Sequence, residues 1–235
     1  MTFFIQSGDL KALVTRKRIK HLYLRVLPPD GRIQISAPMR VSQLYITTFL
    51  ESRRDWIAKR QARIASQAAT PPKQYLSGEL HPLWGQDYPL QVREGTRQTR
   101  VQLKGETILL QIPKGKTPQD RRAALEAWYR RLLKAEAQRQ IPAWEQRMNV
   151  EVKKVYVRRM TSLWGSCTPS RQSIRLNTAL AELSLDKLEY ILVHEMVHLL
   201  EASHNQRFYT LMSQYMPDWK PRRAQLKARS LRKVD

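Results

Sequence analysis

Segment 191–200 places the strongest constraint on how this chain can fold. Every residue in it is apolar except His194, Glu195 and His198. A helix built from this segment is apolar on almost all sides, so we expect it to be buried. Two imidazoles and a carboxylate without partners in such a helix would each cost several kcal/mol. The segment therefore predicts a buried helix whose polar groups share a cation.

The spacing of these polar residues indicates the chemistry. His194 and His198 are four residues apart, which puts them on one helix face with Cβ atoms about 6 Å from each other. That separation lets two imidazoles bind one metal ion. Glu195 points roughly 100° around the helix, where it can reach a water on the metal without binding the metal itself. The pattern is typical of zinc hydrolases and predicts a Zn²⁺ cofactor with Glu195 as the catalytic base.

A third ligand is predicted at His204. It follows His198 by six residues, the offset of metzincins, but those proteins have glycine at the midpoint, where this chain has Glu201. A site of three histidines leaves the open position that a catalytic zinc needs. Two alternatives remain open: Glu201 as a carboxylate ligand, and Cys167 as a thiolate, although a single loop cysteine is more often a small buried residue.

Charge suggests a partner. The chain has 42 Lys and Arg against 20 Asp and Glu, a net charge of +22, and such a field attracts polyanions. Nucleic acid is the first candidate; the alternative is solvated charge with no dedicated ligand. Trp56 lies among basic residues of a predicted helix and could stack on a base, but tryptophan at helical spacing is more often part of the core.

Two features that this sequence lacks indicate the cellular compartment. Cys167 is the only cysteine, so no intrachain disulfide can form. The N-terminus does not have a basic start followed by an apolar stretch, and no run of 18 apolar residues occurs. We expect a cytoplasmic protein without a membrane partner.

Hydrophobic patterning predicts two regions. Residues 1–112 form a β-rich region with a hairpin over 21–37, one helix over 41–65 and a linker near 65–72. Residues 113–235 form the second domain. Its long helix begins after Thr117 and runs to about Met148, and Pro142 is expected to end or kink it near Ile141. Strands are predicted over 152–157 and 173–177, with a loop over 158–171 between them and a basic tail after Lys220.

Several motifs together resemble those of YgjP-like metallopeptidases, which belong with SprT-like and related zincin proteins. They are Arg-Met-Thr-Ser-Leu-Trp-Gly-Ser-Cys at 159–167, Ile-Arg-Leu-Asn at 174–177, the histidine motif at 194–198, Asn205 and Phe208, and in the N-terminal part Arg25, Asp30-Gly31, Pro38 and 54–57. The resemblance implies an α+β fold, with a compact zincin-like domain whose motif helix lies behind a small sheet. It also implies zinc-dependent cleavage of peptides or proteins, and kinship with SprT-like proteins would suggest substrates associated with nucleic acid.

The expected mechanism follows from the motif. Zinc held by His194, His198 and His204 lowers the pKa of its water towards 7, while Glu195 takes the water's proton and passes it to the leaving nitrogen. An extended peptide is expected to pair with an edge strand at 173–177.

Three arginines are candidates for binding an anionic group of the substrate, although they could equally be solvated charges: Arg158, Arg159 and Arg175.

Two other functions stay open. One is a metal-dependent phosphohydrolase acting on nucleotides or other phosphate esters, with arginines holding the phosphate. The other is a basic nucleic-acid-binding protein with a non-catalytic metal site. A closed structural zinc site would need a fourth protein ligand and would have no use for Glu195 beside the first histidine.

Overall fold

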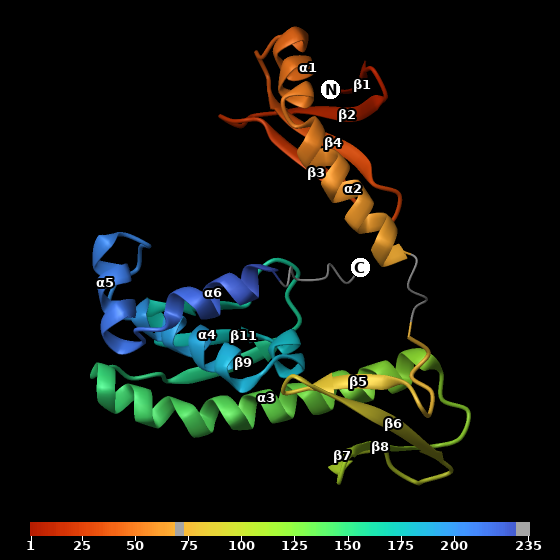
Figure 1. Ribbon diagram of the computed structural model, residues 1–235, viewed down its shortest axis with the longest axis vertical. Helices are drawn as coiled ribbons and strands as arrows, with labels where there is room; N and C mark the ends of the chain where they lie inside the picture. Colours follow the sequence, from red (N-terminus) through yellow and green to blue (C-terminus); the bar gives the residue numbers. More distant parts are fainter. Residues whose placement is uncertain (69–72, 229–235) are drawn as a thin grey trace. The chain divides into compact units, whose positions relative to one another are not determined.

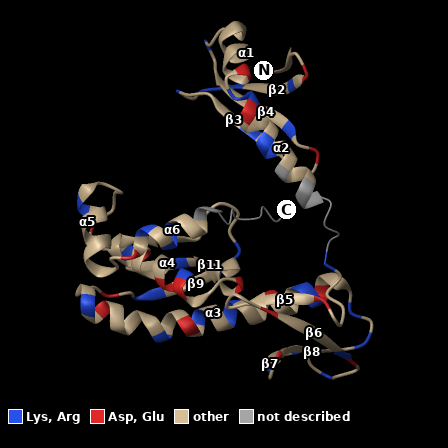
Figure 2. Ribbon diagram, viewed as in Figure 1, with Lys and Arg blue, Asp and Glu red and all other residues tan. Residues whose placement is uncertain are grey.

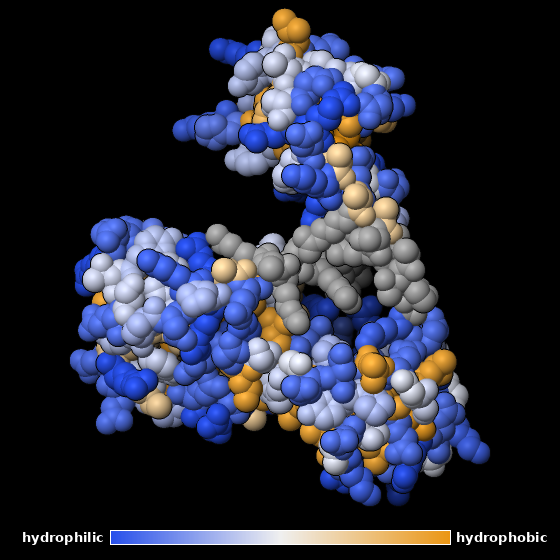
Figure 3. All heavy atoms as spheres, viewed as in Figure 1, coloured by the Kyte–Doolittle hydropathy of each residue, from blue (hydrophilic) through white to orange (hydrophobic). Residues whose placement is uncertain are grey.

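The computed structural model describes residues 1–68 and 73–228 (Figure 1). The chain divides into two compact units, Met1–Pro72 and Lys73–Asp235, and each has its own hydrophobic core. Hydrophilic side chains predominate on the face of the molecule in Figure 3. Within the described ranges, no helix combines the length and apolar character needed to cross a bilayer. The α+β class is confirmed.

The first unit is a mixed four-stranded sheet in the order β1-β2-β4-β3. Its strands are β1 (Thr2–Ser7), β2 (Leu10–Lys17), β3 (Tyr23–Leu27) and β4 (Arg32–Pro38). The predicted hairpin is confirmed as β3 and β4, which pair antiparallel with Val26 opposite Ile33. Strands β1 and β2 were not predicted. Strand β2 pairs parallel with β4, and such long-range pairing leaves little local signal.

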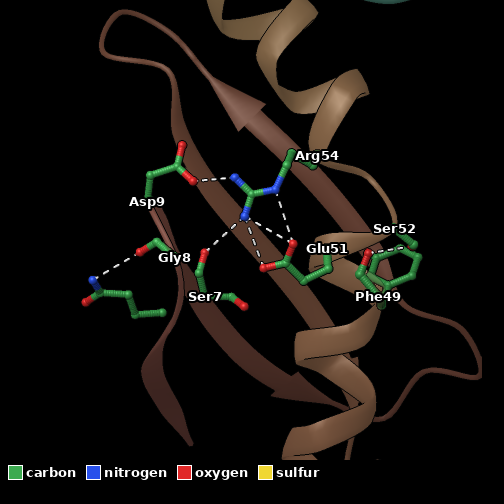
Figure 4. Close-up of polar contacts among 8 residues, drawn as sticks. Ser7, Gly8, Asp9, Phe49, Glu51, Ser52 and Arg54 are labelled. Carbon is green, nitrogen blue, oxygen red and sulfur yellow. Dashed lines mark hydrogen bonds and ion pairs between the residues drawn. The ribbon is translucent and has the colours of Figure 1, made fainter.

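Two helices stand where one was predicted over 41–65. They are α1 (Gln43–Glu51) and α2 (Arg54–Ala68), so part of the predicted linker is helical, and residues 69–72 lie outside the described residues. Arg54, at the start of α2, donates to Glu51 (Nη2–Oε2 3.1 Å) and to Asp9 (Figure 4). This ion-pair network connects the break between α1 and α2 to the turn between β1 and β2.

Trp56 is 48% exposed, so the expectation that this tryptophan belongs to the core is wrong. Its neighbour Ile57 is the buried residue at this point of α2.

The second unit contains two sheets. One has the order β5-β6-β8-β7 and consists of β5 (Leu80–Leu83), β6 (Gln86–Glu94), β7 (Arg100–Lys104) and β8 (Thr107–Ile112). The sequence pattern grouped these strands with the N-terminal region. In the structure Leu83 and Leu110 share one core with Leu125 and Leu133 of the following helix, so the division falls after Pro72 rather than after Ile112.

Helix α3 (Pro118–Met148) runs the length of the second unit (Figure 1). Its predicted start is confirmed by a capping box, in which the amide of Asp120 donates to Thr117 Oγ1 at 3.2 Å. Of the two effects expected of Pro142, an end of the helix near Ile141 is wrong, because α3 continues to Met148. Ile141 and Trp144 are both buried in the core, and packing on both sides of the proline offsets its missing hydrogen bond.

The second sheet has the order β10-β11-β9. Its strands are β9 (Lys154–Arg158), β10 (Gly165–Thr168) and β11 (Ser173–Asn177). Strand β11 pairs antiparallel with β10 and parallel with β9, so the expectation of an edge strand at 173–177 is wrong. The predicted loop over 158–171 contains β10, and this short strand is the edge that β11 was expected to provide.

The remaining elements follow β11. They are the short helix η2 (Thr178–Glu182), α4 (Leu185–Val197), α5 (Gln206–Tyr215) and α6 (Trp219–Ala228). The basic tail predicted after Lys220 is helical as far as Ala228, and residues 229–235 lie outside the described residues. Trp219 and Leu226 of α6 are buried in the core of the second unit.

Candidate metal centre

Helix α4 carries the histidine motif through the core. Leu192 and Val193 have no solvent exposure, while His194 and His198 are half-buried. The helix ends at Val197 rather than Leu200, and His198 is its C-cap. The chain then turns, with the amide of Leu200 bonded to the Val197 carbonyl at 2.9 Å. This turn redirects the backbone so that the next segment returns to the same face of α4.

His204 meets the two motif histidines after that turn. One ligand nitrogen from each of His194, His198 and His204 lies within 4.8 Å of the other two. The Nε2 atoms of His194 and His204 are 3.0 Å apart. Two nitrogens bound to one tetrahedral zinc at its usual bond length lie about 3.3 Å apart. The donor set therefore fits a zinc ion, with little adjustment needed between these two rings.

Glu201 orders the turn that carries His204. Its backbone carbonyl lies 3.1 Å from His198 Nδ1, which leaves Nε2 of that ring for the cluster and sets its tautomer. Its carboxylate accepts the amide of Ser203 at 3.1 Å. Among the described residues, the group able to hold a metal contains neither Glu201 nor Cys167. Glu201 thus acts on the backbone around the histidines.

Phe208 forms an apolar support beneath all three rings. It is fully buried, and its ring centroid lies 5.0 Å from that of His194 and 4.6 Å from those of His198 and His204. Asn205 places it by capping α5, accepting the Phe208 amide at 3.0 Å. The sequence motifs included Asn205 and Phe208 without assigning either a role at the metal centre; an asparagine directly before a helical segment is an N-cap signal.

Burial sets the protonation of the histidines. Together with charge repulsion from His198 and His204, it lowers the pKa of His194 to about 3. Burial also lowers the pKa of His198. Both rings are therefore neutral near pH 7, and the neutral imidazole is the form that binds metal.

Glu195 lies between α4 and β10 and is 5% exposed. Burial raises its pKa to about 8, and a hydrogen bond from the backbone N–H of Cys167 opposes that rise. A carboxyl group with such a pKa can take up and release a proton near neutral pH, as a general base must. The structure thus has a buried carboxyl group directly beside the first motif histidine, and its role as the general base stays a prediction.

Gly165 is required by the close approach of β10 to α4. A Cβ atom at this position would lie 2.6 Å from Glu195 Oε1 and 2.8 Å from Ile191 Cγ2. No side chain fits that space without moving the carboxylate or the helix. This contact explains why a glycine follows the tryptophan in the motif at 159–167.

We expect Gly165→Ala to lower the free energy of unfolding by about 1–3 kcal/mol, because overpacking forces side chains or backbone to shift. Urea unfolding followed by circular dichroism measures this change. Ser166→Ala is the matched control, since that residue lies on the other face of β10 and loses only a hydrogen bond from Arg175 (3.3 Å). Equal stability of Gly165→Ala and the control would contradict the close contact.

Asn177 holds the segment that leads into β10. It is fully buried, and its Nδ2 donates to the carbonyls of Met160 and Leu163, both at 2.8 Å. Its backbone amide bonds to the Trp164 carbonyl at 2.9 Å. Sequence reasoning assigned Asn177 no role, although a buried asparagine ending an apolar strand signals such backbone contacts.

The three candidate arginines do not converge on the histidines. Leu176 of β11 packs in the core, so its neighbour Arg175 lies on the opposite face of the sheet. Arg158 is paired in register with Asn177 and lies on that same outer face. Arg159 forms an ion pair with Glu182, with 3.2 Å between Nη1 and Oε1. An anionic group at the histidines would not meet Arg158 or Arg175.

Comparison with known proteins gives a family match over most of the chain. The model of the YgjP-like metallopeptidase domain matches residues 20–229. The crystal structure of the metallopeptidase zymogen of Pyrococcus abyssi abylysin is similar at 17% identity and a TM-score of 0.36, covering 44% of this chain and 99% of that chain. The crystal structure of the metallopeptidase zymogen of Methanocaldococcus jannaschii jannalysin is similar at 18% identity and a TM-score of 0.34. The match covers 41% of this chain and 95% of that chain. No curated protein matches.

Proposed function

Since the chain belongs to the YgjP-like metallopeptidase family, we propose that it hydrolyses peptide bonds at a zinc ion held by His194, His198 and His204, with Glu195 as general base. One observation carries the proposal. Three imidazoles converge within 4.8 Å beside a buried carboxyl group, and this combination serves a hydrolytic zinc site.

The ligand set and its surroundings support zinc in particular. Imidazole nitrogens suit zinc, and three of them leave one position open. When bound, zinc supplies Lewis-acid polarisation of the scissile carbonyl and makes a water more acidic. Phe208 and the Glu201 carbonyl hold the imidazoles in place, because one packs beneath the rings and the other binds His198 Nδ1.

Glu195 would move the proton. Its carboxylate takes a proton from the attacking water, holds it, and passes it to the leaving nitrogen. The surroundings that raise its pKa to about 8 favour holding that proton. The low exposure of Glu195 also keeps bulk water from the carboxyl group during transfer.

The free edge of β10 is the proposed place for the substrate backbone. Among the described residues, strand β10 pairs only with β11, and Gly165 of β10 lies against Glu195. An extended peptide that added to this edge would place its backbone along the proposed base. Strand β11, which the sequence pattern favoured for this role, pairs with a strand on both sides.

The proposal is tested by measuring metal content and hydrolysis in the purified full chain. We expect about one zinc per chain by elemental analysis, and cleavage of casein that stops with a chelator and returns with added zinc. The same preparations are incubated with nucleoside triphosphates. Phosphate release without peptide cleavage would reject the peptidase in favour of a phosphohydrolase, and zinc binding with neither activity would favour a non-catalytic site.

A further inference from the structure

The face of the β10-β11-β9 sheet that points away from α4 is basic and has an aromatic residue at its centre. Val155 and Val157 pack against the core, so the alternating residues Lys154, Tyr156 and Arg158 lie on the outer face of β9. Arg175 is opposite Tyr156 in the register. Tyr156 therefore has cations on either side along its own strand and across from it, and Figure 2 marks the Lys and Arg residues of these strands in blue.

A hollow of about 500 Å³ opens on this outer face. Its walls carry four cations, Lys153, Lys154, Arg171 and Arg175, and no carboxylate. The remaining lining groups include hydroxyls, which donate readily to phosphate oxygens. The composition of the walls suits an anion.

Most of the cations on this face have no ion-pair partner among the described residues. Over residues 1–68 and 73–228, no ion pair involves Lys154, Arg158, Arg171 or Arg175, while Lys153 has only the exposed Glu151 at 4.0 Å. Cations gathered in this way repel one another, and a bound polyanion would relieve that repulsion.

We propose that this outer face binds single-stranded nucleic acid, with a base stacked on Tyr156 and phosphates held by the surrounding cations. The Tyr156 side chain is 48% exposed, and an aromatic ring among cations is the arrangement that single strands use. A duplex has no free base face to offer the ring. An acidic peptide would engage the cations but has no need of the ring.

The outer face and the proposed peptidase site are on opposite sides of one sheet. Gly165 contacts Glu195 on the core side, whereas Lys154, Tyr156 and Arg175 lie on the other side. Nucleic acid bound here leaves the histidines accessible. Binding and hydrolysis can thus be measured separately, and failure of either proposal does not imply failure of the other.

The first test compares two double variants, each of which removes two positive charges from a different surface. The full chain is titrated against a fluorescein-labelled oligodeoxythymidine of about 12 nucleotides, with fluorescence anisotropy as the readout. We expect Lys154→Gln with Arg175→Gln to weaken binding at least about tenfold and to reduce the log–log salt slope by about 1.4, since each phosphate contact contributes about 0.7. The control, Arg131→Gln with Lys134→Gln, removes the same charge from exposed positions of α3, which packs on the core side of the sheet. An equal loss in both proteins would overturn the site.

The second test concerns the aromatic ring. Tyr156→Ala is expected to bind about tenfold more weakly, and Tyr156→Phe to bind as the wild type does, because stacking needs the ring and not the hydroxyl. Circular dichroism checks that each variant is folded. Wild-type affinity in a folded Tyr156→Ala, or competition by polyglutamate as effective as that by the oligonucleotide, would overturn the assignment to a single strand.

Discussion

Replacing Glu195 by Gln is expected to leave zinc bound and to lower kcat for peptide hydrolysis by about a thousandfold. Gln has nearly the same shape and fits the space between α4 and β10, but its carboxamide cannot accept the proton of the attacking water. Zinc content by elemental analysis and kcat on a fluorogenic peptide measure the two effects. Glu189→Gln is the control on the same helix, since its carboxylate is bonded to Arg222 at 2.6 Å. Full activity in Glu195→Gln would remove this residue from the mechanism.

The same variant has a second readout in the chelated protein. Burial raises the pKa of Glu195 from 4.5 to about 8, so the folded state holds this proton more tightly than the unfolded state does. The contribution of Glu195 to the stability of the metal-free wild type therefore falls as pH rises from about 4.5 to about 8. Glu195→Gln does not have this loss. We expect the metal-free variant to be more stable at pH 8 by several kcal/mol and equally stable below pH 4.5. Equal stability at pH 8 would show that the buried carboxylate is ionised and compensated.

Replacing His204 by Ala is expected to weaken zinc binding by at least about a hundredfold, because one of three nitrogen donors is lost from a site worth roughly 10 kcal/mol or more. Competition with a chromophoric zinc chelator measures the affinity. The thermal midpoint provides a second measure, since zinc should raise it in the wild type and much less in the variant.

Two further variants separate the ligand from its neighbours. His21→Ala removes an exposed histidine of the first unit and should leave zinc affinity unchanged. Glu201→Gln should retain zinc, because the Glu201 carboxylate binds the Ser203 amide and lies outside the histidine group. A loss of affinity in Glu201→Gln as large as in His204→Ala would identify Glu201 as the third ligand.

Features that depend on local interactions could be predicted from the sequence. The spacing of His194 and His198 is a property of one helix turn, the Thr117 cap depends on residues three apart, and the hairpin of β3 and β4 follows from alternation around a turn. Each of these features depends on neighbours within a few residues, so their patterns persist whatever the rest of the fold does. The family motifs identified the same stretch and the same chemistry.

Pairing between strands far apart in the sequence could not be predicted from it. Strand β10 lies within a predicted loop. Because it pairs with β11, the edge of the sheet is β10 and not β11. Pro142 stays within a helix because its neighbours are buried, and the β5–β8 sheet joins the second unit because it shares a core with α3. These outcomes depend on contacts between residues far apart in sequence, where packing overrides local preference.

The sequence by itself determined the proposed reacting groups: two histidines one turn apart and an acid beside the first, on a helix that is apolar on almost every side. Only the tertiary structure decided how these groups are arranged. The turn ordered by Glu201 brings His204 to the cluster, Phe208 supports all three rings, and Gly165 lets β10 reach Glu195. The physical reason is that helix spacing is local, whereas closing a site requires segments that meet only when the core has packed.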